Sequence, residues 1–366
     1  MRYVVSLMAV FFLLSNITLA QTGNEDGDAK APAESLLLKN YRPQSIYVLP
    51  EYKAEKASFK AIDMHSHAYP HSEQEIEEWV QTMKENNIQK TVLLTYATGA
   101  EFDSLYAVYS KYGDYFELWC GIDYTGYKDP GFAQRAIKEL ERLHALGATG
   151  IGELGDKGKG LFYSHPTKAF GMHIDDERMD PILERAGELD MPVTIHVAEP
   201  YWFYMPMDST NDGLMNALNW RLDNQENILN HGEMLETLEN AVRKHPNTTF
   251  IAAHLGNSAY DLRIIGRMLE KYPNLYADVS ARYAELSQIP RHVRIFITEH
   301  QNKIVYGTDM GTSDDMYDVT FRVLETMDEH FYRHEMFGYH WSLNGFNLSD
   351  KVLKKIYTTN PQKILN

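Results

Sequence analysis

The chain has 366 residues, of which 44% are hydrophobic, and its formal net charge is −16. This length and apolar content are enough for one large core or for two smaller ones. The acidic excess disfavours a nucleic-acid backbone or an anionic membrane surface as the partner. The single cysteine, Cys120, excludes an intrachain disulfide, and its place in an apolar run predicts a small buried side chain.

The first sixty residues are predicted to lie outside the main domain. Residues 1–20 have the pattern of a signal peptide, with Arg2, an apolar core over residues 4–14 and the small residues Thr18 and Ala20 at the cleavage site. We therefore expect an exported protein, periplasmic or extracellular, whose mature chain does not insert into a membrane. Residues 21–60 are predicted to be a disordered leader followed by an N-terminal arm with an extended stretch at residues 45–49.

From residue 61 onward the chain alternates between strand-like and helix-like segments. Strands are expected at residues 61–67, 91–96, 117–124, 149–154, 193–198, 249–254, 275–279 and 303–308. Helices are expected between them, for example at residues 74–86, 131–146, 180–189, 231–244 and 259–271. This alternation predicts that residues 61–366 form one α/β domain, a distorted TIM (β/α)8 barrel. An open doubly wound sheet is the alternative, but no glycine-rich phosphate-binding motif follows any strand.

Two connections are longer than a barrel requires. Residues 156–180 follow the fourth strand and residues 199–230 follow the fifth, so both loops would lie on the catalytic face. The second loop begins with Tyr201 and Trp202, which we expect to bind substrate. Arg282, just after the seventh strand, is a candidate for binding a substrate carboxylate, and solvated side chains are expected for Lys157 and Lys159.

Six residues with metal-ligand side chains lie at or near the C-terminal ends of these strands. They are His65, His67, Glu153, His196, His254 and Asp309. Catalytic residues of parallel barrels lie at this end of the strands, so the six side chains could meet at one point. Imidazoles and carboxylates together are suitable ligands for a divalent metal.

The alternation of side chains along a strand refines this expectation. His65 and His67 are two residues apart, so both should point into the barrel, and Asp63 should share that face and support a ligand. His254 should share its face with Ala252, and small neighbours of this kind would leave room for a metal and a substrate.

The segments DMHSH, IHVAEP, AAHLGN and GTDM, in this order, resemble the amidohydrolase superfamily. They are most similar to its amidohydrolase-related branch, which includes metal-dependent decarboxylases and lactone hydrolases. The resemblance implies a TIM barrel with a metal held by His65, His67, His196 and Asp309. It also implies that His254 contacts substrate or the attacking water, or binds a second metal.

Glu153 in GIGELG is similar to a bridging glutamate found in two-metal members of that superfamily. The alternatives are a buried glutamate paired with a cation, or one that binds substrate. The ion is expected to be zinc, with manganese or iron as alternatives, and one or two ions fit the pattern.

The predicted activity is hydrolysis of an amide, lactone or ester in a small-molecule substrate. Asp309 would act as the general acid and base, and His254 would help to polarise the attacked carbonyl. A decarboxylase on the same scaffold is the first alternative, and a catalytically inactive metal-containing binding protein is the second. The resemblance also allows a homodimer.

Overall fold

The structure, a computed structural model, describes residues 32–162 and 165–365. The predicted signal peptide and most of the predicted leader lie outside the described residues. The chain divides into two compact units, residues 1–42 and 43–366. The described part of the first unit contains two short 3-10 helices, η1 (Ala33–Ser35) and η2 (Leu38–Asn40).

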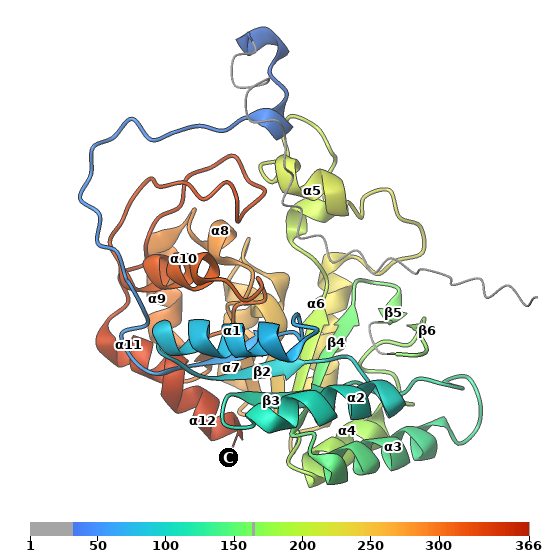
Figure 1. The fold of residues 1–366 in the computed structure, drawn as a ribbon. Coiled ribbons are helices and arrows are strands. Elements are labelled where there is room, and N and C mark those ends of the chain that lie inside the picture. The colour runs from blue at the N-terminus through green and yellow to red at the C-terminus, as the bar shows by residue number, and fades with distance from the viewer. Residues whose placement is uncertain (1–31, 163–164, 366) are drawn as a thin grey trace, which may run out of the picture. The chain divides into compact units, whose positions relative to one another are not determined.

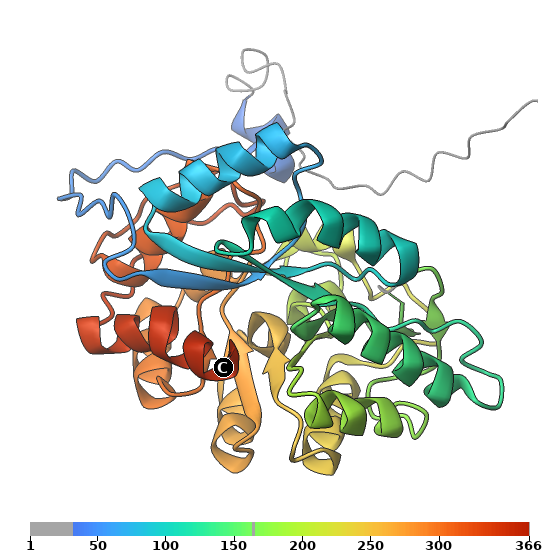
Figure 2. The same ribbon diagram turned by 60° about the horizontal axis from the view of Figure 1, so that its bottom comes forward.

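The second unit is built around a sheet of eight parallel strands (Figures 1 and 2). In sheet order they are β1 (Ala61–Ser66), β2 (Ile88–Leu94), β3 (Phe116–Cys120), β4 (Gly150–Asp156), β7 (Val193–Val197), β8 (Phe250–Ala252), β9 (Leu275–Asp278) and β10 (Ile304–Val305). The amide nitrogen of Met64 donates to Tyr306 O at 3.0 Å, and that of Asp309 donates to His65 O at 2.9 Å. These bonds join the first strand to the segment after the last one, so the predicted TIM barrel is confirmed.

Helices connect the strands and lie outside them. The longer ones are α1 (Glu73–Glu85), α2 (Gly99–Tyr109), α3 (Phe132–Leu146), α4 (Asp180–Glu188), α6 (His231–Lys244), α7 (Arg263–Lys271), α9 (Pro290–Glu299) and α10 (Asp314–Glu325). The short helices α8 (Tyr283–Leu286), α11 (Asp350–Lys354) and α12 (Asn360–Leu365) complete the domain, with a π-helical turn, η6 (Lys355–Thr359), before α12. Helix α7 begins later than predicted because a turn precedes it, in which the Asp261 carboxylate accepts from Arg263 N at 3.1 Å.

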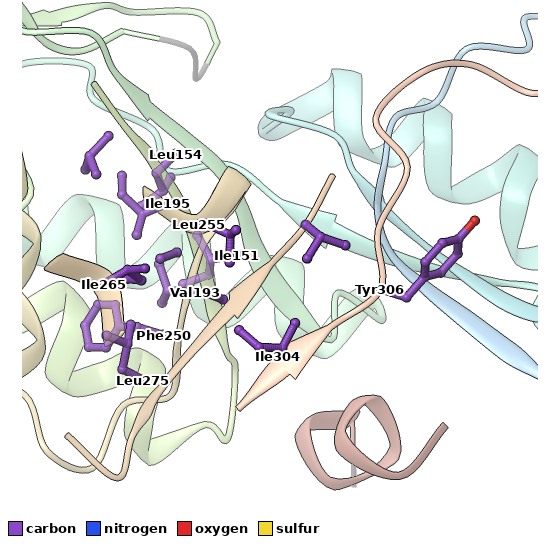
Figure 3. Close-up of a cluster of buried hydrophobic side chains, with 14 of the residues drawn as sticks. Ile151, Leu154, Val193, Ile195, Phe250, Leu255, Ile265, Leu275, Ile304 and Tyr306 are labelled. Atoms are coloured by element: carbon purple, nitrogen blue, oxygen red, sulfur yellow. The ribbon is translucent and has the colours of Figure 1, made fainter. Parts of the chain in front are cut away.

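The apolar side chains form two clusters on opposite sides of the sheet. The larger cluster joins the strands to the surrounding helices, and part of it is drawn in Figure 3, where Phe250 and Leu275 lie beside Ile265 of α7. The smaller cluster contains strand side chains, apart from Ile364 and Leu365 of α12. It therefore fills the inside of the barrel. Cys120 belongs to the larger cluster and is fully buried, as predicted.

Both long loops have structure of their own. The loop after β4 forms a hairpin of β5 (Gly160–Leu161) and β6 (Ala169–Phe170). The loop after β7 contains η4 (Tyr201–Tyr204) and α5 (Leu214–Trp220). Among the described residues, none of the helices combines the length and apolar character needed to cross a bilayer.

Candidate metal centre

The structure brings the six predicted metal-ligand residues together at the C-terminal end of the barrel. Subsets of them place ligand atoms within 4.8 Å of one another, namely His65, His67 and Glu153, and also Glu153, His196 and His254. A third subset contains Asp278, which the sequence analysis did not identify, together with His65 and His254. All of these side chains except His67 are buried.

A register shift in β1 decides which of its side chains enter the barrel. Asp63 pairs with Thr91 and Ser66 pairs with Leu93, so three residues of β1 correspond to two of β2. The extra residue turns His65 into the barrel although Asp63, two positions earlier, faces the helices. The Thr91 hydroxyl, at the same level as Asp63, contacts Met83 of α1.

Asp63 therefore does not share the face of His65 as predicted, but it supports this residue through the main chain. Its carboxylate accepts from the Thr308 hydroxyl at 2.6 Å, from Thr308 N at 3.0 Å and from His65 N at 3.1 Å. Burial raises the pKa of Asp63 to about 7, against the lowering effect of these bonds. Asp63 thus joins β1 to the segment after β10 and fixes the main chain, not the ring, of His65.

The predicted placement of Ala252 beside His254 is wrong for a related reason. Ala252 belongs to the cluster that faces the helices. His254 follows in a left-handed conformation, with φ of 57°, so the strand alternation ends before it. A turn of this kind costs free energy for a residue other than glycine, and such turns concentrate at functional sites.

Each histidine ring is held through one nitrogen, which leaves the other directed at the centre. His65 Nδ1 lies 2.9 Å from Asp278 Oδ2, and His67 Nδ1 donates to Leu94 O at 2.7 Å. His196 uses Nε2, which donates to Ala198 O at 2.9 Å, and His254 Nδ1 donates to Ser280 O at 2.9 Å. A carbonyl or carboxylate on the far nitrogen fixes the tautomer and the orientation of a ligating imidazole.

Glu153 lies between these imidazoles. Its Oε1 is 3.0 Å from His196 Nδ1, 3.5 Å from His254 Nε2 and 3.7 Å from His65 Nε2. Its Oε2 is 4.0 Å from His67 Nε2. Burial would raise the pKa of Glu153, but the imidazoles of His65 and His196 lower it well below its usual value, so the carboxylate is ionised.

Asp309 closes the other side of the centre. It has a φ of 52°, and its Oδ1 lies 3.0 Å from His67 Nε2 and 4.0 Å from His65 Nε2. Burial opposes ionisation, but His65 and His67 lower the pKa of Asp309 well below its usual value. Its side chain is 22% exposed, more than the other carboxylates of the centre, so Asp309 faces the opening of the site.

Gly307 explains how His65 fits between the strands. A Cβ atom at Gly307 would lie 2.8 Å from the Cβ of His65 and 3.2 Å from that of Ser280. The glycine of the GTDM segment therefore allows the close approach of β1 and the segment after β10.

The residues of the centre fit a divalent metal. His65 Nε2 is buried without a hydrogen-bond partner among the described residues, which is unusual for a polar atom and is what a metal ligand requires. Burial lowers the pKa of His65, but the carboxylates of Asp278 and Glu153 raise it to about 10. Without a cation, protons on the imidazoles balance this negative charge, and a dication would replace them.

Two further residues of the centre were missed by the sequence analysis. Asp278 ends β9 and holds the His65 ring, and its position at the end of a predicted strand is a signal that could have identified it. Tyr96 follows β2, and its hydroxyl lies 2.8 Å from His67 Nε2 and 3.3 Å from Glu153 Oε2.

A charged group lies next to the metal centre and contains the predicted substrate ligand Arg282. Its guanidinium donates to Asn257 Oδ1 from Nε at 2.9 Å and from Nη2 at 2.6 Å. Arg282 Nη2 lies 4.0 Å from Glu199 Oε2, and Lys157 forms an ion pair with the same glutamate. Lys157 is therefore not the solvated side chain that was predicted. Burial lowers the pKa of His254, and the positive charge of Arg282 lowers it further, so His254 is neutral.

Tyr201 and Trp202 pack against other aromatic side chains. Tyr201 stacks on Tyr260 with ring centroids 4.5 Å apart, and Trp202 packs beside Trp341 at 5.8 Å. None of their described ring contacts reaches a histidine of the metal centre. Their predicted role in substrate binding stays a prediction.

Comparisons with known proteins agree with this fold. A family described as amidohydrolase matches residues 62–366 of the chain. A putative amidohydrolase from Staphylococcus aureus is similar in structure, with a TM-score of 0.54 and 16% identity over 84% of this chain and 99% of that one. The 2,6-dihydroxybenzoate decarboxylase from Rhizobium gives a TM-score of 0.51 and 15% identity over 84% and 98%.

A dihydroxybenzoic acid decarboxylase from Polaromonas sp. JS666, solved with bound manganese, gives a TM-score of 0.53 and 16% identity over 84% and 97%. At these identities the likeness shows the fold alone. A comparison with curated protein sequences finds no match.

Proposed function

The chain belongs to the amidohydrolase family, and on this basis we propose that it is a metal-dependent hydrolase with a two-metal site bridged by Glu153. The position of the Glu153 carboxylate carries this proposal. Its Oε1 lies within 3.7 Å of ring nitrogens of His65, His196 and His254, and its Oε2 lies 4.0 Å from His67 Nε2. A carboxylate whose two oxygens both face imidazoles of the centre is suited to bridge two cations.

The bridging position favours hydrolysis over decarboxylation. When bound, a divalent metal lowers the pKa of a coordinated water molecule from about 15.7 to about 7 and polarises a carbonyl oxygen. A hydrolase needs both effects at once, on the nucleophile and on the substrate. Zinc is the proposed metal, with manganese or iron as alternatives.

Asp309 is proposed to move the protons of the reaction. Its carboxylate is ionised and partly exposed, so it can accept a proton from the attacking water at Oδ1 or Oδ2. The same group then donates this proton to the leaving oxygen or nitrogen. His254, held neutral with Nε2 directed at the centre 3.8 Å from Asp309 Oδ2, is placed to contact the attacked carbonyl when it is not a ligand.

Arg282 is proposed to bind a negatively charged part of the substrate. Three of its donor contacts, to Asn257 and to Ala281 O, are satisfied inside the protein and fix the guanidinium, whose charge acts on His254. A guanidinium that is fixed in this way binds a carboxylate with little loss of side-chain entropy. Small anionic lactones, esters or amides are therefore the substrates to test first. We also propose that the protein is exported, on the basis of residues 1–20.

Metal content tests the bridging role of Glu153. The zinc-loaded protein is expected to hold about two ions per chain, measured by inductively coupled plasma mass spectrometry after removal of free metal. Glu153→Gln keeps the volume but loses the negative charge, so it should hold one ion or none. Glu117→Gln, which changes a glutamate paired with Lys90 at the opposite end of the barrel, should still hold two. One ion per chain in the wild-type protein would reject the two-metal site.

The type of reaction is tested with two substrate panels. Hydrolysis is followed as acid release from lactones, esters and amides that carry a carboxylate, and decarboxylation is followed by trapping CO₂ from aromatic and keto acids. Turnover in the first panel alone is the expected result. CO₂ release without hydrolysis would assign the protein to the decarboxylases, and metal binding without turnover in either panel would favour a binding protein.

A further inference from the structure

The arm, residues 43–52, leaves apolar side chains uncovered. Ile46 is 86% exposed and Tyr47 is 60% exposed, while Val48 is fully exposed. Leu49 and Tyr52 are also exposed. Folded monomers rarely present so many neighbouring apolar side chains to water. The arm therefore has the composition of a contact surface.

The arm is held in place although its side chains are uncovered. His334 Nε2 donates to Pro43 O at 2.8 Å, Ser45 Oγ lies 3.0 Å from His330 Nδ1, and Tyr52 N donates to Asp328 Oδ1 at 2.6 Å. Figure 1 shows this blue segment beside the orange and red part of the chain. Because both ends are fixed, little conformational entropy is lost when the arm binds a partner.

The main chain of the arm bonds to side chains and not to another strand: Pro43 O accepts from His334, and Tyr47 N donates to Ser45 Oγ at 3.3 Å. Within the described part of the structure, residues 43–51 make no hydrogen bond between main-chain groups. Pro43 and Pro50, which lack an amide proton, limit the pairing segment to the residues between them. Tyr47 packs edge-on against His330, with ring centroids 4.9 Å apart, so the alternate residues Ile46 and Val48 point away from the body.

We propose that the arm is the contact between two copies of this chain, in which two arms pair as antiparallel strands across a twofold axis. An antiparallel strand pair is self-complementary, so the arm of one chain can pair its main-chain groups with those of the same arm in a second chain. Pairing would cover part of the apolar surface that each arm exposes, and a specific interface needs about 1,000 Å² in total.

Charge favours a second copy over a membrane as the partner. Residues 43–50 contain no charged side chain, in a chain whose formal net charge is −16. An uncharged arm that extends from the body allows two acidic copies to meet where their repulsion is weakest. An anionic membrane would need a basic segment, which the arm lacks.

Molar mass in solution tests the proposal. The full chain is examined by sedimentation velocity and by light scattering over a wide range of concentrations, and twice the monomer mass is expected. The double variant Ile46→Asp/Val48→Asp should be monomeric, because it places four charges at the paired strands. Both side chains are exposed, so the variant should keep the melting temperature of the monomer. Ile295→Asp, at a residue of α9 that is 56% exposed, is the matched control and should stay dimeric.

Each other outcome would overturn the proposal. A wild-type chain that is monomeric at every concentration has no such contact, and a double variant that stays dimeric uses another surface. Flotation of the wild-type chain with neutral phosphatidylcholine vesicles, lost in the double variant, would identify the arm as a membrane contact instead. These measurements need no substrate or metal, so they stand apart from the proposed hydrolase activity.

Discussion

At the candidate metal centre, hydrogen-bond partners fix the orientation of each histidine ring. The four imidazoles differ in which nitrogen is anchored, and the acceptor is a main-chain carbonyl for three of them and Asp278 for His65. Because one nitrogen of each ring is bonded to its acceptor, the other nitrogen of each ring is the one that could bind a metal. The positions of Asp278 and of the carbonyl groups are therefore as important for metal binding as the histidines.

The role proposed for Asp309 predicts the effect of a single substitution. Asp309→Asn keeps an oxygen ligand but removes the base, so turnover should fall by a factor of about 10² to 10⁴, with metal still bound. Activity on the substrate found in the hydrolysis panel and metal content, measured on the same sample, check this. Arg282→Lys is a useful comparison, because loss of the guanidinium fork should raise KM more than it lowers kcat. Normal turnover in Asp309→Asn would remove Asp309 as the proton carrier.

At the scale of single elements, helix ends are fixed by local sequence. Helix α1 begins after Ser72, whose hydroxyl accepts from Glu75 N while the Glu75 carboxylate accepts from Ser72 N. Helix α6 begins with the same arrangement of Asn230 and Glu233. A capping box of this kind satisfies two amide groups that the helix itself leaves unpaired. The starts of α1 and α6 were accordingly predicted to within one residue.

The cap of α1 can be tested by unfolding. Ser72→Ala removes the hydroxyl acceptor and should lower the free energy of unfolding by about 1 kcal/mol. Ser104→Ala in the exposed middle of α2 is the control, since its hydroxyl bonds only to Ala100 O within the same helix, and its effect should be much smaller. Urea unfolding followed by circular dichroism provides both values. Equal effects at the two positions would contradict a specific capping role.

At the scale of the whole molecule, the candidate metal centre joins side chains from several strands of the barrel. The proposed ligand atoms come from β1, β4, β7, the segment after β8 and the segment after β10. A cation bound here is bound by the folded chain and not by the unfolded one, so it should stabilise the fold. Without it, the buried carboxylates depend on imidazole protons for their neutralisation.

Metal removal should therefore lower the melting temperature. At a free metal concentration about a thousand times Kd, binding adds about 4 kcal/mol to the free energy of unfolding, which corresponds to a decrease of several degrees after chelation. Differential scanning calorimetry of the loaded, chelated and reloaded protein measures this change. An unchanged melting temperature, with metal removal confirmed by mass spectrometry, would show that the ion is not linked to folding.

The sequence by itself determined the architecture and the chemical identity of the site. Eight apolar strands in alternation with helices can bury their surfaces only in a few ways, and the six residues at the strand ends indicated metal-dependent chemistry. Both conclusions depend on local patterns along one chain, which is why they could be made before any contact was known. The arm was also recognised as an extended segment.

Only the tertiary structure decided which side chains face one another. The extra residue in β1 turns Asp63 outward and His65 inward, and another between Ile151 and Leu154 brings Glu153 into the centre. Such shifts depend on how a strand pairs with its neighbour, which a period of two residues along one strand cannot reveal. The partners of His65 and Arg282 are likewise distant in the chain, and only folding brings Asp278 and Asn257 to them.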